Sequence, residues 1–135
     1  MAEDWNASII KEFRENDGKV GGRFKGAPIL LLHSYGAKTG QERVNPMMYQ
    51  SVDDGWAVFA SKGGAPTNPD WYYNLVANPE GAIEVGTETI KVKGRVVDGT
   101  EREAIWSKQK ADYPNFAEYE RNTTREIPVI VLERA

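Results

Sequence analysis

The sequence predicts a single small domain, a mainly antiparallel β-barrel with flanking helices. The chain has 135 residues, and no repeat or linker interrupts it; this is close to the commonest size of one domain. Apolar periodicity indicates a helix followed by five or six strands with short helices between them. Hairpin turns join several strands, which favours a small barrel over a parallel sheet. We therefore expect residues 1–135 to form one domain, with a helix over 1–17 ahead of the barrel.

The first expected element is an amphipathic helix. Trp5, Ile9 and Phe13 recur at four-residue spacing, and charged side chains of both signs occupy the opposite face. Gly18 marks the end of this helix. Because its polar face is not basic, its charge gives no argument for attachment to a membrane.

Apolar runs and turn residues define the first half of the barrel. The expected segments are a glycine-rich loop over 18–28, a buried strand over 29–32, a loop over 36–41, a strand over 43–52, a hairpin turn at 54–55 and a strand over 56–60. A short helix then begins, with Asn68 as its N-cap and Pro69 at its first position. Asn78-Pro79 ends it.

The second half combines a hairpin, helices and a closing strand. The expected segments are a strand at 83–85, a turn at 86–87, a strand at 90–96, a helix from 100 toward 113, a helical turn from 114 and a strand over 127–132. Alternation places Ile90, Val92 and Val96 on the buried face of their strand. Thr100 and Glu103 have the spacing of a capping box.

The composition excludes several kinds of chemistry. There is no cysteine and one histidine, His33, so we expect no disulfide, no thiolate chemistry and no metal site. A serine hydrolase would need His33 as its base, and no G-x-S-x-G element accompanies it. His33 lies in an apolar strand, where a structural role is expected. Any difficult chemistry must therefore come largely from a cofactor.

No segment is long and apolar enough to span a membrane. The N-terminus lacks a basic region followed by an apolar core, so no signal peptide is expected and a cytoplasmic location is favoured.

Positive charge is concentrated in one part of an acidic chain. The net charge is −3, but residues 19–43 carry five cations and one acid, which leaves −7 for the rest. This pattern favours a local anion site over a nucleic-acid surface, which is usually basic throughout. The alternative is a set of solvated loop lysines.

Two glycine-containing loops are candidates for that anion site. In the segment 36–43, Lys38 and Arg43 flank glycines that allow close approach of the backbone, although a charged hairpin loop explains the pattern equally well. In the segment 60–66, Lys62 precedes two glycines ahead of a helix N-terminus. A flexible connector is the alternative there.

The aromatic residues are expected to serve mainly the core. Tyr113 and Tyr119 are the better candidates for a pocket wall, because a phenol can face a ligand while its ring packs. Asn74 is either a polar contact with a ligand or a solvated helix residue.

Several motifs together resemble the deazaflavin (coenzyme F420)-dependent nitroreductase family, from about residue 9 to residue 134. The residues that carry the resemblance are Gly18-Lys19-Val20-Gly21-Gly22, the segment 36–46 (GAKTGQERVNP), Ser61-Lys62-Gly63-Gly64, Trp71-Tyr72 with Asn74, Ala77-Asn78-Pro79, Tyr113-Pro114 and Ile127-Pro128-Val129. The resemblance implies a split β-barrel that binds reduced F420 and passes a hydride to a quinone, an activated enone or a nitroaromatic compound. The family is chiefly actinobacterial.

The resemblance also implies which residues bind the coenzyme, take part in catalysis and line the acceptor pocket. Coenzyme binding is assigned to Lys38, Thr39, Gly40, Arg43, Val44, Asn45, Pro46, Met48, Ala60, Ser61, Lys62, Gly63, Trp71 and Asn74. Within this set, Lys38 and Arg43 would hold the coenzyme's phosphate and acidic glutamyl tail. Catalytic roles are assigned to Ser61, beside the deazaflavin ring, and to Tyr113 and Tyr119. The acceptor pocket is assigned to Met48, Tyr113, Phe116 and Tyr119.

Three positions depart from the family pattern. Ala37 stands where many relatives have arginine, which would weaken binding of the tail. Met48 and Phe116 replace tyrosines of the better-known nitroreductases. These changes make the expected pocket more apolar and favour a quinone or lipid-like acceptor over a nitro compound.

Two alternatives stay open at this point. One keeps the barrel but replaces F420 with flavin mononucleotide (FMN), and the other is a non-catalytic deazaflavin carrier. The expected partner is a small-molecule hydride acceptor, with no nucleic acid. The sequence fits either a monomer or a homodimer. It also fits a cytoplasmic protein, with or without peripheral contact with a membrane.

Overall fold

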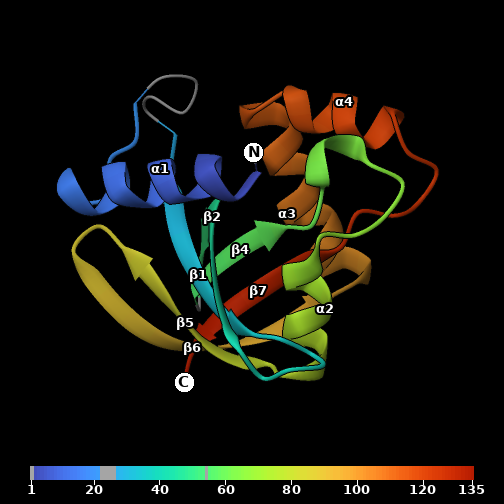
Figure 1. The fold of residues 1–135 in the computed structure, drawn as a ribbon. Coiled ribbons are helices and arrows are strands. Elements are labelled where there is room, and N and C mark those ends of the chain that lie inside the picture. The colour runs from blue at the N-terminus through green and yellow to red at the C-terminus, as the bar shows by residue number, and fades with distance from the viewer. Residues whose placement is uncertain (1, 22–26, 54) are drawn as a thin grey trace.

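The computed structural model describes residues 2–21, 27–53 and 55–135, with no account of the side chains of residues 2–6 and 63. Figure 1 shows a curled antiparallel sheet with helices packed around it. The helical elements are α1 (Ala2–Glu15), η2 (Lys62–Gly64, a 3₁₀ turn), α2 (Asp70–Ala77), α3 (Gly99–Asp112) and α4 (Asn115–Arg121). The strands are β1 (Ile29–Tyr35), β2 (Glu42–Met48), β3 (Gln50–Val52), β4 (Gly55–Phe59), β5 (Glu80–Val85), β6 (Glu88–Val97) and β7 (Val129–Arg134).

The described strands form one seven-stranded sheet in the order β2-β1-β5-β6-β7-β4-β3. Every neighbouring pair is antiparallel, with His33 opposite Val44 in β1–β2 and Val58 opposite Ile130 in β4–β7. The mainly β, antiparallel barrel-type fold predicted from the hairpin signals is confirmed.

The prediction of one continuous strand over 43–52 was wrong. The chain breaks at Tyr49 into β2, which pairs with β1, and β3, which pairs with β4. These two strands are the opposite edges of the sheet, so this segment crosses from one edge to the other and curls the sheet. The Tyr49 amide donates to the Pro28 carbonyl. Apolar periodicity does not reveal such a corner, because both halves of the run are extended.

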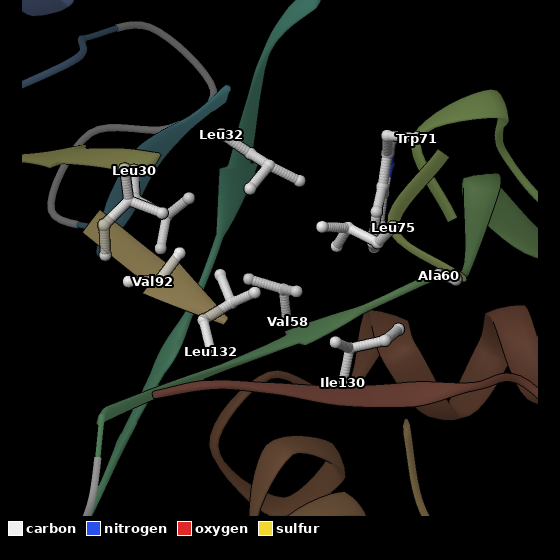
Figure 2. Packing of buried hydrophobic residues seen from close by; sticks show 10 residues of the cluster. Leu30, Leu32, Val58, Ala60, Trp71, Leu75, Val92, Ile130 and Leu132 are labelled. Carbon is white, nitrogen blue, oxygen red and sulfur yellow. The ribbon is translucent and has the colours of Figure 1, made fainter. Parts of the chain in front are cut away.

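Buried side chains lie on both faces of the sheet. In β7, Ile130 and Leu132 belong to a cluster that α2 covers, whereas Val129 and Val131 belong to a second cluster beneath α3 and α4. Figure 2 shows the first cluster. A third cluster packs α1 against β1 through Phe13. These clusters explain why β1 and β7, which are buried on both faces, read as apolar runs rather than as clean alternation.

Some element ends differ from the predictions. Pro69, not Asn68, occupies the N-cap of α2, because the Asn68 Oδ1 accepts a hydrogen bond from Arg125 instead. The capping box of Thr100 is also wrong: α3 starts at Gly99, after Asp98, with no side-chain cap.

Two further differences concern the strands of the second half. Val96, expected to be buried, is 50% exposed, and its neighbour Val97 is buried beneath α3. The closing strand runs over Val129–Arg134 rather than over 127–132, because Arg102 binds the Ile127 carbonyl outside the sheet.

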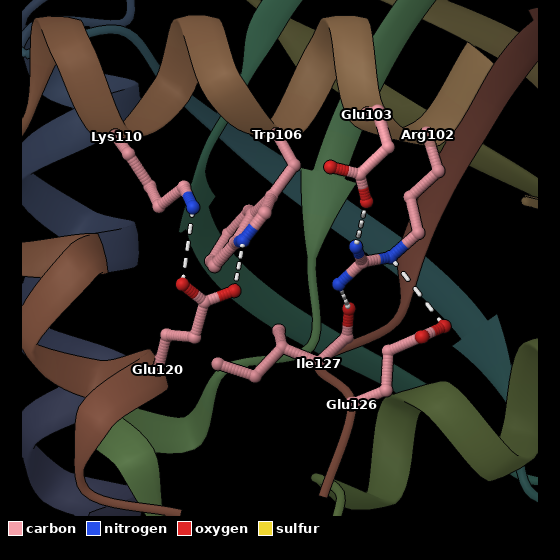
Figure 3. A network of polar contacts seen from close by, with 7 residues as sticks. All are labelled: Arg102, Glu103, Trp106, Lys110, Glu120, Glu126 and Ile127. Atoms are coloured by element: carbon pink, nitrogen blue, oxygen red, sulfur yellow. Dashed lines mark hydrogen bonds and ion pairs between the residues drawn. The ribbon is translucent and has the colours of Figure 1, made fainter. Parts of the chain in front are cut away.

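A polar network joins α3 to α4 and to the segment that precedes β7 (Figure 3). Arg102 is buried and donates to the Ile127 carbonyl at 2.8 Å. Glu120 accepts hydrogen bonds from the Trp106 indole at 2.6 Å and from Lys110 at 3.0 Å. The Trp106 bond is the main reason that the pKa of Glu120 lies below its ordinary value. This network fixes the position of α4.

Among the described residues, no helix has the length and apolar character that crossing a membrane requires.

Candidate functional site

A groove of about 910 Å³ lies between α1, the β1–β2 loop, β2 and the first turns of α2. Its described lining residues are Ala7, Ile10, Gly36, Ala37, Lys38, Thr39, Glu42, Arg43, Val44, Asn45, Asp70, Trp71, Tyr73 and Asn74. A volume of this size is near the upper end of the range for small-molecule and cofactor sites. The groove is therefore the leading candidate for a cofactor site.

The β1–β2 loop is closed by its own backbone. The Gly36 amide donates to the Gln41 carbonyl, and the Gly40 amide donates to the Gly36 carbonyl, both at 2.8 Å. Gly40 has a φ of +69°, which a residue with a side chain adopts only with strain. The tight closure leaves Lys38 and Thr39 exposed on the groove.

Asn74 fixes this loop to α2. Its side chain is buried, and its Oδ1 accepts a hydrogen bond from the Ala37 amide at 3.0 Å. One turn later, the Asn78 side chain donates to the Tyr35 carbonyl at 3.4 Å. Asn74 is therefore an anchor of the loop that carries Lys38, a role that sequence reasoning did not anticipate.

The groove carries charges of both signs. Lys38 and Arg43 are exposed on it, and Glu42 and Asp70 also line it. Of the other cations in the predicted basic segment, Arg23 and Lys25 lie outside the described residues. Among the described lining residues, the cations of the groove come from the hairpin of β1 and β2.

The second candidate loop, residues 60–65, has an unusual backbone. Ser61 is buried, and Lys62 has a φ of +48°, which is uncommon for a residue other than glycine. The carbonyls of Ala60, Ser61 and Ala65 all accept hydrogen bonds from Arg125. Sequence reasoning missed Arg125, because nothing in its local sequence indicates a contact with a loop about sixty residues earlier in the chain.

This loop packs closely on α4. A Cβ added to Gly64, whose φ is +83°, would lie 2.9 Å from the Tyr119 carbonyl oxygen. Tyr119 itself is half-buried, and its phenol oxygen accepts from the Asn115 side chain at 3.0 Å. The loop and the predicted acceptor-pocket helix are therefore neighbours.

The model of the F420H(2)-dependent quinone reductase family matches residues 5–134. The chain belongs to this family. The resemblance inferred from the motifs is thus confirmed, together with the class of enzyme, an oxidoreductase, and coenzyme F420 as its cofactor.

Individual members of the family agree with this assignment. An F420H(2)-dependent quinone reductase of Mycobacterium tuberculosis (strain ATCC 25618 / H37Rv) is 39% identical over 126 residues, which cover 90% of this chain and 85% of the relative. A solved F420-H2 dependent reductase, FDR-A, has a TM-score of 0.72 at 39% identity, covering 78% of this chain and 94% of that one.

Other solved structures bear on the fold. One described as a domain-swapped dimer has a TM-score of 0.74 at 36% identity and covers 98% of this chain and 100% of that one. A FAD-binding protein from Mesorhizobium loti shares the fold alone, with a TM-score of 0.55 at 14% identity.

The structure brings together about half of the coenzyme-binding residues that the resemblance to the F420-dependent family implies. Those that line the groove are Lys38, Thr39, Arg43, Val44, Asn45, Trp71 and Asn74. Ser61 and Lys62 belong to the second loop, with Gly63 inside η2. Met48 packs against the clusters beneath α1 and α3.

Three of the four predicted acceptor-pocket residues, Tyr113, Phe116 and Tyr119, lie in or next to α4 rather than in the groove, and Met48 ends β2. Phe116 is 6% exposed and packs between Phe59, Trp106 and Tyr119, with ring centroids 5.6, 6.2 and 5.3 Å away. Tyr113 and Tyr119 are half-buried. In this structure Phe116 is a core residue that supports Tyr119 from behind.

His33 takes part in a polar cluster that attaches α1 to the sheet. Its Nε2 lies 2.6 Å from Glu84 Oε2, and Arg14 of α1 makes two hydrogen bonds to the same carboxylate, at 3.1 and 2.7 Å. The Arg14 hydrogen bonds are the main reason that the pKa of Glu84 lies below its ordinary value. These contacts agree with the structural role expected for His33.

Neutralising Glu84 should make the protein less stable in a pH-dependent way. Its pKa is lowered by folding, so the stabilisation exists above the unfolded-state pKa of about 4.3 and is lost as the pH falls through the folded-state value. We expect Glu84→Gln to lower the free energy of unfolding at neutral pH by about 1–2 kcal/mol, because a charge-assisted contact is lost.

Urea unfolding between pH 7 and acid pH measures this effect. The deficit of Glu84→Gln should shrink as wild-type Glu84 becomes protonated. Glu80→Gln, at the exposed start of the same strand, serves as the control and should behave like wild type. If Glu84→Gln lowered the free energy of unfolding equally at both ends of the pH range, the stabilising role given to ionised Glu84 would be contradicted.

Within the part of the chain that the structure describes, no group of three or more His, Asp or Glu side chains is placed to hold a metal ion.

Proposed function

We propose that this protein transfers a hydride from reduced F420 to a quinone, and that the groove between the β1–β2 hairpin and α2 holds the coenzyme. The observation that carries the proposal is the placement of Lys38 and Arg43 on this groove in a chain that the F420H(2)-dependent quinone reductase family matches over residues 5–134.

The residues present suit the coenzyme's anionic parts. Arg43 can bind a phosphate or carboxylate with two parallel hydrogen bonds, and Lys38 provides a mobile positive charge. Asn74 holds the loop that presents Lys38. Trp71 and Val44 form an apolar part of the groove wall. We assign Thr39, Gly40, Asn45 and Pro46 to the same binding surface.

The coenzyme supplies the hydride when bound, so the protein's contribution is alignment and exclusion of water. We assign Ala60, Ser61, Lys62 and Gly63 to the deazaflavin end of the coenzyme. Tyr113 and Tyr119 are assigned to the acceptor side. Met48 gives that side apolar character, and Phe116 supports it from the core by packing against Tyr119.

The source of the proton is part of this proposal. A tyrosine has an ordinary pKa of about 10 and is a weak acid at neutral pH. We assign Tyr113 and Tyr119 to orienting the acceptor, and either one of these phenols or solvent to supplying the proton. We place the reaction in the cytoplasm and assign it to a monomer or a homodimer. Peripheral contact of the protein with a membrane would give it access to a lipid-like quinone.

Titration with oxidised F420 and, separately, with FMN tests the cofactor assignment through quenching of tryptophan fluorescence. Saturable binding of F420 in preference to FMN is expected. Preference for FMN would indicate that the protein is a flavin-dependent oxidoreductase with the same fold.

Oxidation of reduced F420 in the presence of menadione separates an enzyme from a carrier. We expect turnover that depends on menadione and is slower with a nitroaromatic compound. Tight binding of F420 without turnover on a quinone, an enone or a nitro compound would identify a coenzyme carrier.

A further inference from the structure

A single guanidinium group links the two segments on which coenzyme binding has been proposed. Arg125 lies in the segment between α4 and β7. It donates to the carbonyls of Ala65 at 2.9 Å, Ala60 at 3.1 Å and Ser61 at 3.0 Å, and to Asn68 Oδ1 at 2.6 Å. The carbonyls belong to the 60–65 loop, whereas Asn68 immediately precedes the N-cap of α2.

These contacts decide which backbone groups of the loop stay available. The Ser61 and Lys62 carbonyls also accept bonds inside the turn, from the Gly64 and Ala65 amides. Among the described residues, no acceptor binds the amides of Ser61 and Lys62. Arg125 therefore holds the loop with the carbonyl oxygens of Ala60, Ser61 and Ala65 directed at its guanidinium group. The adjacent Ser61 and Lys62 amides remain without an acceptor among the described residues, an arrangement that suits an anion or a carbonyl oxygen.

The loop is held in a conformation that it would not favour alone. Lys62 has a φ of +48°, and strained residues of this kind persist only where surrounding contacts fix them. No carboxylate among the described residues lies within ion-pair distance of Arg125. Its positive charge is therefore satisfied by neutral oxygens, so it also favours an anionic ligand at the loop.

We propose that Arg125 is the positioning residue of the coenzyme site: it sets the Ser61–Lys62 backbone in its binding conformation and fixes that loop relative to the start of α2. The inference rests on the proposed function in one respect, that the 60–65 loop contacts F420. The planar fork of arginine reaches four acceptors on two segments, which the single ammonium group of lysine cannot do.

The test compares Arg125→Lys with Arg121→Lys, an exposed arginine at the end of α4. Both variants keep the net charge. Arg125→Lys should weaken F420 binding by about 5- to 30-fold, as expected for the loss of one or two net hydrogen bonds. Arg121→Lys should bind like wild type.

Hydrogen exchange of the Gly64 and Ala65 amides, which donate to the Ser61 and Lys62 carbonyls, reports the positioning role without coenzyme. We expect faster exchange there in Arg125→Lys, with protection of the β7 amides retained. Wild-type F420 affinity of a folded Arg125→Lys, or unchanged exchange of the Gly64 and Ala65 amides, would overturn the inference. If wild type does not bind F420, the proposed function fails, and the exchange measurement still decides whether Arg125 orders the loop.

Asn68→Ala provides a second variant in case Arg125→Lys does not fold. It removes one acceptor and leaves the three carbonyl contacts, so a 2- to 5-fold loss of F420 affinity, about the effect of a single neutral hydrogen bond, is expected. Wild-type affinity of a folded Asn68→Ala would overturn the inference.

Discussion

Replacement of Lys38 and Arg43 together by alanine is expected to weaken F420 binding by about 30- to 1,000-fold. Each side chain is exposed on the groove, and a hydrogen bond to a charged group contributes about 1.5–3 kcal/mol. Because both cations act on the same ligand, their effects need not add, so the double variant is expected to lose about 2–4 kcal/mol of binding free energy.

Because both side chains bind through their charge, the double replacement should also change how F420 affinity depends on salt. The two cations act by charge, so raised salt should weaken wild-type binding more than binding by the double variant. The free energy of unfolding should change by less than about 0.5 kcal/mol, because both side chains lie on the surface. Quenching of tryptophan fluorescence at two salt concentrations, combined with urea unfolding, measures all three quantities.

Lys91 and Lys93 provide the matched control. Both are exposed on β6, and their replacement by alanine removes the same charge as the double variant of the groove. This control should bind F420 like wild type. Equal loss of affinity in the two double variants would show that general charge, rather than the groove, determines coenzyme binding.

Replacement of Leu132 by alanine is expected to have the largest effect on stability, a loss of about 2–5 kcal/mol. Leu132 is fully buried on β7 and packs in the cluster that α2 covers (Figure 2). It lies opposite Trp56 on β4 and Gly94 on β6, so strands on both sides limit how far the cavity can collapse. The midpoint of urea unfolding should fall while its slope stays unchanged.

Val96→Ala is the control for this second prediction. Val96 is half-exposed on β6, so its truncation should change the unfolding free energy by less than about 0.5 kcal/mol. Leu132 does not line the described groove, and the folded Leu132→Ala protein should therefore bind F420 with wild-type affinity. A similar loss of stability in both variants would contradict the central position given to Leu132.

The order of elements was accessible to sequence reasoning because it depends on local patterns. Ile9 and Phe13 recur at helical spacing and pack α1 against the sheet. The turn at 86–87 joins β5 to β6 as predicted, and Asn78-Pro79 ends α2. In each case the signal and the structure that it specifies lie within a few residues of one another.

The candidate site was only partly accessible in this way. Lys38 and Arg43 were recognised because cations beside glycines in one loop are a local signal, and the structure places both on the groove. The wall opposite them comes from α2, where Trp71 was identified by resemblance. Asp70 and Tyr73 also line the groove, and no pattern distinguished them from other polar or aromatic helix residues.

The sequence by itself determined a mainly antiparallel β fold of the F420-dependent family and the loop that carries Lys38 and Arg43, the proposed anion-binding cations. Only the tertiary structure decided that the run 43–52 breaks at Tyr49 to reach both sheet edges. It also decided that Asn74 and Arg125 hold the two candidate loops. The contacts of Asn74 and Arg125 join residues about forty to sixty-five positions apart and form only once strand pairing has fixed which segments are neighbours.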